Sequence, residues 1–332
     1  MRALICRQYG TPDTLAIEDI EPPALKPGHV RVAVRTVGVS FAVILGIAGK
    51  HQNKPGLPYI PGGELAGTVL EVADDVAHVK AGDRVAALIS AGGYAEQAVV
   101  PARNVWPIPG DMSDETALAV TSTYGSIYTA LEWSSRLQPG ETLLVHGAGG
   151  NSGLGAVALG KAMDARVIGT ASSAAKRETA QRFGADHVID YRSEDTRQRV
   201  LDLTDGRGAD VIFDPVGGDL FDLSLRCVAP DGRLLIYGFA SGRIPQIPAN
   251  LLLVKNVSAI GYYWGYYMGW GRQEPAPGTV DRQRRYMARL MDWSRSGRLP
   301  DLPSTVYPLD EYRAAMAQIS GREAIGKILL RL

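Results

Sequence analysis

Cysteine is scarce in this chain of 332 residues, which holds only Cys6 and Cys227. Two cysteines exclude a disulfide framework and any zinc site built from four cysteines. Such low cysteine use is typical of a reducing compartment, and we expect a cytoplasmic protein. The length itself predicts roughly two domains.

Net charge and long apolar runs are also missing. Lys and Arg number 35, as do Asp and Glu, so the formal charge is zero. A neutral chain has no overall attraction to nucleic acid or to an anionic membrane. The start of the chain has no apolar run of signal-peptide length. Residues 142–160 lack charged side chains but contain six glycines, which favours strand, turn and helix over a membrane span.

Glycine, in contrast, is abundant, with 38 residues, so the fold needs many tight turns or close backbone approaches. The first 110 residues or so are predicted to be rich in β-structure. Residues 29–35 alternate apolar and polar side chains, which is the period of a half-buried strand, and segments 65–72 and 83–89 are similar. Prolines at positions 12, 22, 23, 55, 58 and 61 disfavour long helices there.

The pattern changes from about residue 116 onward, where a helix over 117–131 is followed by alternating strands and helices. This alternation predicts right-handed βαβ units and a doubly wound parallel sheet of the dinucleotide-binding type. Amphipathic helices around 282–293 and 311–319 and a strand at 328–330 follow. The six sheet strands are expected at 142–146, 165–169, 187–190, 210–213, 234–237 and 257–262, with helices at 154–163, 174–183, 194–203 and 220–228.

A glycine-rich turn joins the first of these strands to its helix. Gly147, Gly150 and Gly153 are spaced G-x-x-G-x-x-G. Glycine lets the backbone pass close to a pyrophosphate, and the helix N-terminus then offers free N–H groups and the positive end of its dipole. A tight strand-to-helix turn without a ligand is the alternative. In this βαβ context, the pattern predicts nucleotide binding.

The end of the next strand indicates which cofactor binds. NAD sites usually carry an Asp or Glu there for the ribose 2′-hydroxyl, but residues 167–173 contain no carboxylate. The hydroxyls of Thr170 and Ser172, with Lys176 on the first helical turn, suit a 2′-phosphate. The sequence therefore predicts NADPH rather than NADH. The alternative is that Lys176 and Arg177 are ordinary surface charges.

At this point the chain resembles the zeta-crystallin-type quinone oxidoreductases of the medium-chain dehydrogenase/reductase superfamily. The resemblance spans nearly the whole chain, and its motifs occur in the family's order, although they do not specify a substrate. They lie at 58–67 (PYIPGGELAG), 145–155 (VHGAGGNSGLG), 167–173 (VIGTASS), 184–191 (GADHVIDY), 214–218 (DPVGG), 232–238 (GRLLIYG) and 326–327 (GK).

The resemblance implies an α/β protein with a GroES-like β-barrel domain and an inserted Rossmann domain, a doubly wound parallel sheet. We assign the GroES-like catalytic domain to residues 1–122 and 265–332, and the Rossmann NADPH-binding domain to residues 123–264. Members usually form homodimers by pairing the last Rossmann strand, which here runs from Ser258 to Tyr262.

The resemblance also implies which residues contact NADPH. Asn151 replaces the family's usual glycine in the loop and is predicted to add a side-chain contact. The predicted cofactor-binding residues are Phe41, Thr129, Gly150, Asn151, Ser152, Gly153, Leu154, Thr170, Ser172, Lys176, Tyr191, Phe239, Ala240, Tyr263 and Arg322.

No metal site is expected. Zinc alcohol dehydrogenases of this superfamily place a His before the Glu of the front motif, whereas this chain has Gly63 before Glu64. The five histidines show no ligand spacing. Glu64 is therefore predicted to be a structural carboxylate.

The predicted substrate wall departs from the family. The family often has Gly-Val-Asn-Phe followed by an acid, but here Ser40 replaces the Asn and Val43 the acid. The pocket is predicted to be more apolar than usual. Ser40 and Tyr59 are the candidate catalytic residues, and His51 and Tyr263 are further candidate proton donors, although each of these four could instead have a purely structural role.

We predict a zinc-independent reductase that transfers hydride from NADPH to quinones. One alternative is the reduction of activated C=C bonds in enones, enals or enoyl thioesters, which needs a proton donor. A second alternative is an NADPH-binding protein with a structural or RNA-associated role, suggested by Arg282, Arg284, Arg285 and Arg289. The aromatic segment 262–270 is either a substrate lid or an interface.

Overall fold

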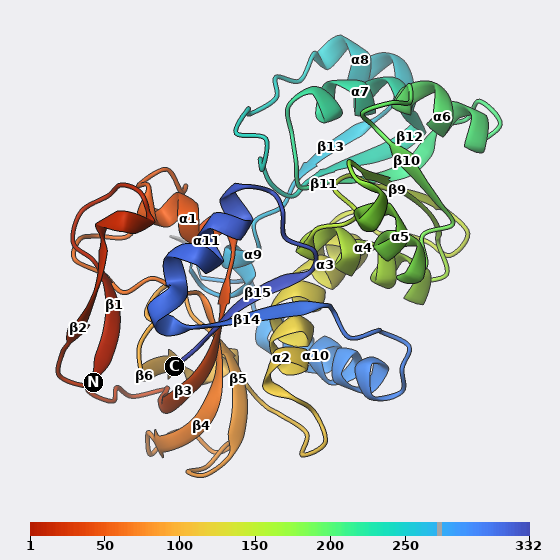
Figure 1. The fold of residues 1–332 in the computed structure, drawn as a ribbon. Helices are drawn as coiled ribbons and strands as arrows, with labels where there is room; N and C mark the ends of the chain where they lie inside the picture. The colour runs from red at the N-terminus through yellow and green to blue at the C-terminus, as the bar shows by residue number, and fades with distance from the viewer. Residues whose placement is uncertain (271–273) are drawn as a thin grey trace. The chain divides into compact units, whose positions relative to one another are not determined.

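The computed structural model describes residues 1–270 and 274–332 (Figure 1). The chain forms two compact units. Unit 1 comprises Met1–Ser122, Gly265–Met291 and Pro303–Leu332, and unit 2 comprises Thr123–Trp264 and Asp292–Leu302. The residues 292–302 therefore pack with unit 2. No helix in the described part of the chain is long and apolar enough to cross a membrane.

Unit 2 contains a parallel sheet of six strands in the order β10-β9-β8-β11-β12-β13, which confirms the predicted doubly wound sheet. The order reverses between β8 and β11, so this pair marks the switch point of the sheet. Helices cover both faces of the sheet (Figure 1). The strands are β8 (Thr142–Val145), β9 (Arg166–Ala171), β10 (His187–Asp190), β11 (Ala209–Asp214), β12 (Val228–Ile236) and β13 (Ser258–Gly261).

The helices of unit 2 largely follow the predicted periodicity. The helix after the glycine-rich turn begins at residue 151, three residues earlier than predicted, because Gly150 already acts as its N-cap. The helix α8 was not predicted, since none of its residues is buried and no apolar period marks it. The helices are α4 (Asn151–Ala162), α5 (Ala174–Arg182), α6 (Thr196–Leu203), α7 (Asp219–Cys227) and α8 (Ala249–Lys255).

The helix predicted over 117–131 is longer and less regular than expected. It begins as α2 (Asp114–Leu118), because the Ser113 hydroxyl accepts the Thr116 N–H at 3.1 Å and caps it. It continues through a π-helical turn at Ala119–Tyr124, α3 (Gly125–Thr129) and a second π-helical turn at Ala130–Ser134. Such π-turns are rare inside helices and are frequent at functional sites.

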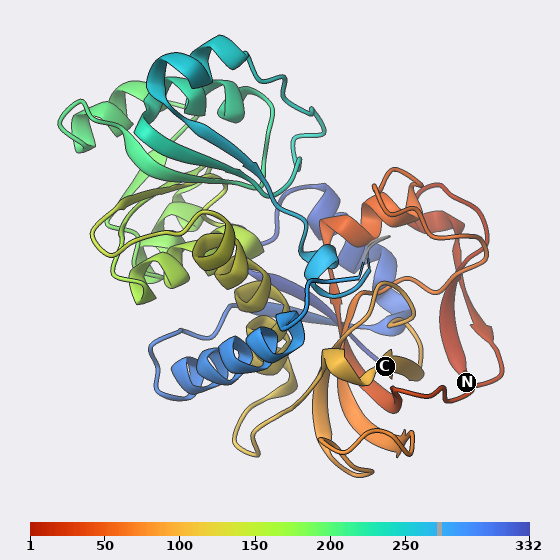
Figure 2. The same cartoon turned by 180° about the vertical axis from the view of Figure 1, so that it is seen from behind.

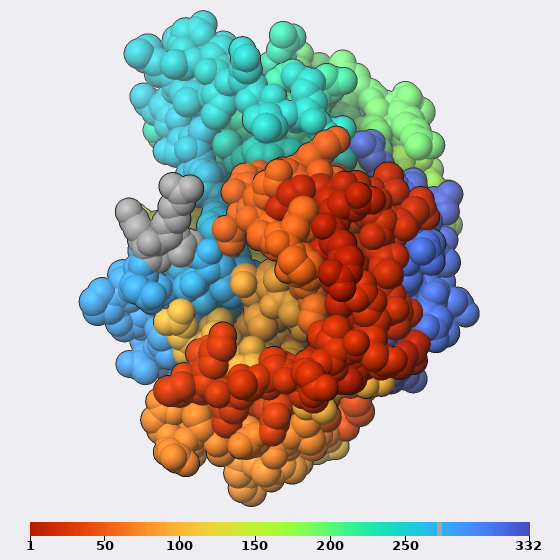
Figure 3. Space-filling model, turned by 90° about the vertical axis from the view of Figure 1, so that its left-hand side faces the viewer, coloured from red at the N-terminus to blue at the C-terminus, as the bar shows by residue number. Residues whose placement is uncertain are grey.

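Unit 1 is built around an antiparallel sheet in which the long strand β3 pairs with β15, β4 and β6. Figure 2 shows its strands β3–β5 in orange and α10 as the long blue helix, and in Figure 3 the first strands and α1 (red to orange) form one continuous surface. The strands are β1 (Arg2–Cys6), β2 (Leu15–Asp19), β3 (His29–Val39), β4 (Glu64–Val72), β5 (Arg84–Leu88), β6 (Gln97–Pro101), β7 (Val105–Pro107), β14 (Ser304–Pro308) and β15 (Lys327–Arg331).

Few helices accompany this sheet, as the prolines predicted. Two of them are short: α1 (Phe41–Ile47) and α11 (Tyr312–Ser320). The helix α9 (Trp264–Tyr267) begins at the last residue of unit 2 before the chain enters unit 1, and the last residues of α10 (Thr279–Arg295) belong to unit 2. Alternating valines of β3 point into the core together with residues of β4, β5, β6, β15 and α11. The sheet and its core therefore confirm a GroES-like unit rich in β-structure.

Candidate functional site

The glycine-rich loop of unit 2 joins β8 to α4 as a tight turn. Gly147 has a φ of 64°, which favours glycine, and its carbonyl accepts the Gly150 N–H at 3.0 Å. A Cβ on Gly153 would lie 2.6 Å from the Gly147 carbonyl carbon and 2.7 Å from the Ala148 Cα. Only glycine at 153 lets the helix start this close to the loop.

The N-terminus of α4 is open to a ligand. Gly150 is the N-cap, no side chain caps the helix, and its first turn holds no acidic residue. The free N–H groups and the helix dipole therefore favour an anion there. The Asn151 side-chain amide and the Thr123 hydroxyl are joined by hydrogen bonds of 3.1 and 3.2 Å. The side chain that was predicted to contact phosphate is therefore hydrogen-bonded within the protein.

The end of β9 lies beside this loop. Lys176, in the first turn of α5, packs its stem on the loop, because a Cβ on Gly149 would meet the Lys176 Cγ at 2.7 Å. The neighbouring Arg177 instead pairs with Asp190 at 2.6 Å. Ser173 caps α5 through the Lys176 N–H. Lys176 thus lies beside the glycine loop that leads into α4. The residues from Arg166 to Ser173 contain no carboxylate.

The other predicted residues of unit 2 follow strand ends. Tyr191 follows β10 and is 38% exposed. Phe239 and Ala240 follow β12: Phe239 packs near Gly217, and the Ala240 N–H bonds the Pro215 carbonyl at 3.1 Å. These residues therefore share the carboxyl edge of the sheet with the glycine loop, the edge where open α/β sheets bind ligands.

Two further predicted residues of unit 2, Thr129 and Tyr263, are associated with the segment that follows β13. Thr129 is fully buried, and its hydroxyl bonds the Ser126 carbonyl at 2.9 Å and the Tyr262 hydroxyl. Tyr262 in turn stacks on Tyr237 with ring centroids 5.8 Å apart. Tyr263, in contrast, is 43% exposed. The aromatic segment therefore begins as a packed element of unit 2.

Ser40 caps α1 in unit 1. Its hydroxyl oxygen accepts the Val43 N–H at 3.4 Å, and Phe41 is the first helical residue. The hydroxyl proton of Ser40 is not used by this cap. His51 forms a local turn with Asn53, and Arg322 is an exposed residue after α11 with a φ of 58°.

Tyr59 has a buried hydroxyl group. Among the described residues, this hydroxyl makes no hydrogen bond to nitrogen or oxygen, and its neighbour is the Cys6 thiol, a weak partner. Burial is the main reason that the pKa of Tyr59 is raised above its usual value of 10.0. The phenol therefore stays protonated across the physiological range, and it is a weaker acid than an exposed tyrosine.

Glu64 belongs to a buried ion pair that the sequence did not reveal. The Lys327 ammonium lies 2.7 Å from the Glu64 carboxylate and 2.8 Å from the Ser122 hydroxyl, and both charged side chains are nearly inaccessible to solvent. The glycine-lysine motif at 326–327 and the front motif were each visible in the sequence. The ion pair between Glu64 and Lys327 could not be predicted from them, because the two residues are 263 positions apart in the sequence.

The described residues do not provide a zinc site. They contain no group of three or more His, Cys, Asp or Glu side chains that could hold a metal ion. Glu64 is held by Lys327 instead, and Cys6 and Cys227 are both buried free thiols in different units. The available donors thus do not fit the three or four ligands that zinc requires.

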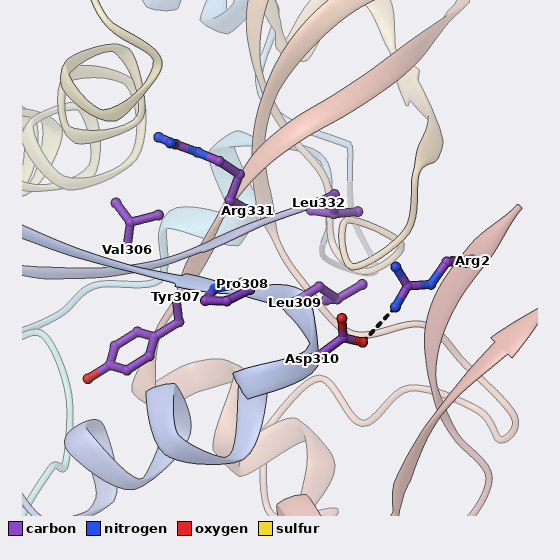
Figure 4. Close-up of a pocket in the computed structure, with 8 residues that line it drawn as sticks. All are labelled: Arg2, Val306, Tyr307, Pro308, Leu309, Asp310, Arg331 and Leu332. Carbon is purple, nitrogen blue, oxygen red and sulfur yellow. Dashed lines mark hydrogen bonds and ion pairs between the residues drawn. The ribbon is translucent and has the colours of Figure 1, made fainter.

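A hollow of about 480 Å³ in unit 1 lies beside β14 and the C-terminus (Figure 4). It is wide open to solvent. Arg2 there is paired with Asp310 at 2.6 Å, and Arg331 is paired with Glu115. Both arginines of this hollow therefore already have carboxylate partners among the described residues.

Comparison with known proteins agrees with this arrangement. The family described as zinc-binding dehydrogenase matches residues 153–276, and the alcohol dehydrogenase GroES-like domain matches residues 26–110. The quinone oxidoreductase-like protein 2 homolog of Nematostella vectensis is 40% identical over 99% of this chain and 88% of its own length.

Solved structures cover the whole chain. The quinone oxidoreductase of Pseudomonas syringae is 32% identical with a TM-score of 0.91, covering 100% of this chain and 99% of that one. The Escherichia coli quinone oxidoreductase, solved as a complex with NADPH, is 27% identical with a TM-score of 0.92 and full coverage of both chains. The chain therefore belongs to the quinone oxidoreductase family of the medium-chain dehydrogenase/reductase superfamily.

Proposed function

We propose that this protein is an NADPH-dependent, zinc-independent reductase of quinones. The observation that carries the proposal is the open, acid-free N-terminus of α4 with the Lys176 stem packed on its glycine loop. The helix end suits the pyrophosphate, and the lysine suits the 2′-phosphate that distinguishes NADPH from NADH. A Cβ at position 153 would collide with the backbone of Gly147 and Ala148, so glycine there lets the loop turn tightly into the helix.

The chemistry divides between cofactor and protein. NADPH, when bound, supplies the hydride. The quinone takes up that hydride and one proton to give the hydroquinone, so a proton from solvent suffices. The chain's own residues bind and orient: we propose that Gly150, Ser152, Gly153 and Leu154 hold the pyrophosphate, while Ser172, Lys176 and Tyr191 hold the 2′-phosphate. Phe41, Thr129, Asn151, Thr170, Phe239, Ala240, Tyr263 and Arg322 remain predicted cofactor contacts.

Reduction of an activated C=C bond is the second candidate function, and Tyr59 favours it. An enolate formed by hydride addition needs a proton. The Tyr59 hydroxyl is buried, lacks a nitrogen or oxygen partner among the described residues and, like any tyrosine at neutral pH, carries a proton. We propose Tyr59, or the Ser40 hydroxyl, as the donor if alkenes are the substrates.

The test is NADPH consumption by the purified protein with ortho- and para-quinones, an enone, an enal and a simple ketone. NADH runs in parallel, and a chelator is added to one series. Turnover of quinones with NADPH, unchanged by the chelator, is the expected result. Turnover of alkenes alone would indicate that the function is C=C reduction.

The alternative of an NADPH-binding protein has its own outcome. Tight NADPH binding without any turnover would contradict both proposed reactions and favour that alternative. Salt-sensitive RNA binding that NADPH displaces would then assign an RNA-associated role.

We also propose that the protein is a homodimer. β13 is an edge strand of the sheet in unit 2. The neighbouring α8 exposes Leu253 by 76% and Val254 by 69%, and Ile244 before it by 68%. An unpaired edge beside exposed apolar side chains is suited to pairing with a second copy. Light scattering of the native protein checks the mass, and charged replacements of Leu253 and Val254 should yield monomers.

A further inference from the structure

A row of three polar side chains crosses the carboxyl end of the sheet in unit 2. Leu144 of β8 lies opposite Ile168 of β9 and Ile212 of β11. Two positions further along the same strands come His146, Thr170 and Asp214, on the same face of the sheet. His146 and Thr170 have no exposed surface, and Asp214 has 3%. Buried polar groups of this kind must satisfy one another.

The hydrogen bonds of the row have a fixed direction. Ser224 of α7 donates its one hydroxyl proton to the Leu220 carbonyl at 2.7 Å. Its oxygen therefore accepts from His146 Nε2, which is 2.7 Å away. Burial lowers the pKa of His146 below its usual 6.5, so the ring is neutral and carries its proton on Nε2. Nδ1 is then an acceptor, and the Thr170 hydroxyl, 3.2 Å away, donates to it.

Asp214 is the unsatisfied member of the row. One carboxylate oxygen accepts the N–H groups of Val216 and Gly217 at 2.7 and 2.8 Å. The other is buried and has no hydrogen-bond partner among the described residues. Asp214 is also the charged group whose field acts on the His146 ring. Asp214 and Thr170 belong to β11 and β9, which lie on opposite sides of β8.

The row supports the loops that are proposed to bind NADPH. The Thr170 carbonyl accepts the N–H of Ala148, which lies in the glycine loop, at 2.9 Å. Two residues after Thr170, the chain reaches Ser172. On the other side, Val216 approaches Gly147, since a Cβ there would lie 3.3 Å from its Cγ2. His146 therefore sits where the glycine loop, the end of β9 and the loop after β11 meet.

We propose that His146 is a positioning residue for the nucleotide pocket: by accepting the Thr170 proton, it fixes the end of β9 against the glycine loop. This inference rests on the proposed binding of NADPH by unit 2. The Thr170 hydroxyl can donate or accept, so protonation of Nδ1 would reverse this hydrogen bond rather than break it.

The first test replaces the hydroxyl and leaves the ring in place. Thr170→Val is close in shape but removes the donor, whereas Thr170→Ser restores it. NADPH fluorescence titration of the full chain at about pH 8 is expected to show a Kd raised about fivefold for Thr170→Val, as for one lost hydrogen bond, and nearly normal for Thr170→Ser. Equal Kd values for all three proteins would overturn the proposal.

The second test removes the acceptor. In a His146→Ala background, Thr170→Val is expected to raise the Kd for NADPH no further, because the link between the two residues is already absent. A Kd that rises as much as it does in the wild-type background would contradict the proposal. If the wild type binds no NADPH at all, the proposed function itself fails first.

Discussion

The two units hold their key polar groups in opposite ways. In unit 2, the loop between β8 and α4 is shaped by glycine backbone and leaves a helix end without a side-chain cap. In unit 1, Glu64 and Lys327 bury two opposite charges against each other at 2.7 Å. The first arrangement keeps polar groups available for a ligand, while the second consumes them within the protein. Ligand binding is therefore expected to depend on the glycine loop and stability on the ion pair.

The largest effect is expected from breaking the ion pair. Lys327→Met leaves the Glu64 carboxylate buried without its partner, which costs about 3–5 kcal/mol of unfolding free energy. Chemical denaturation measures it. The double variant Glu64→Gln/Lys327→Met is the control, because it removes both charges and should recover most of the loss. A double variant as unstable as the single one would show that packing, not charge, governs this centre.

Gly153→Ala should be next in size. Its Cβ would lie 2.6 Å from the Gly147 carbonyl carbon, a backbone atom that cannot move away cheaply. We expect about 3 kcal/mol of destabilisation and loss of NADPH binding. Gly150→Ala is the matched control for stability, since its Cβ would come no closer than 3.6 Å to the Gly147 carbonyl oxygen. Equal melting temperatures for the two variants would contradict the close packing of loop and helix.

The same contrast explains what the sequence could predict. The strands β8 and β10 and the glycine loop follow from local patterns: a short apolar run, a turn and a helix start occupy neighbouring positions. Most elements of unit 2 were therefore predicted to within a few residues, although β12 begins at Val228, six residues before its predicted start. β14, in contrast, is mostly exposed and carries no clear alternation, and α8 buries none of its residues. Neither has the apolar period on which such prediction depends.

Contacts between side chains that are distant in the sequence could not be predicted from local patterns. Glu64 was predicted to be structural, but only the fold shows that Lys327 is its partner. Thr170 was predicted to contact the cofactor, and the fold adds that its hydroxyl is hydrogen-bonded to His146. The alternation of side chains along β9 places Thr170 on the same face as the buried Ile168. That Ser224 of α7 lies on this face as the other partner of His146 was not available from the sequence.

Lys176→Met tests whether Lys176 binds the 2′-phosphate of NADPH. Losing one charge-assisted contact should raise the Kd for NADPH about tenfold and leave that for NADH nearly unchanged. Arg177→Met on the same helix is the control. Its guanidinium is already paired with Asp190 at 2.6 Å, so a smaller effect is expected. Equal losses for the two variants would indicate a general electrostatic effect rather than a specific contact.

His146 should also make the stability of unit 2 depend on pH. Burial holds the folded pKa below the usual 6.5, so between the two values the unfolded chain binds a proton that the folded chain does not. Stability is then complete above about pH 6.5 and falls as the pH drops, by about 1 kcal/mol near pH 5.5. Denaturation at several pH values measures this fall, and His146→Asn should flatten it. A wild-type curve that stays flat there would contradict a neutral buried ring.

The smallest effect on stability is expected at Tyr59, a residue of unit 1. Tyr59→Phe removes a hydroxyl that bonds no nitrogen or oxygen among the described residues, so stability should change by less than about 1 kcal/mol. If quinones are the substrates, kcat should stay within about twofold, because solvent can protonate the hydroquinone. If alkenes are the substrates, general-acid catalysis is lost and kcat should fall about 100-fold. The ratio of the two activities in this one variant therefore separates the two proposed reactions.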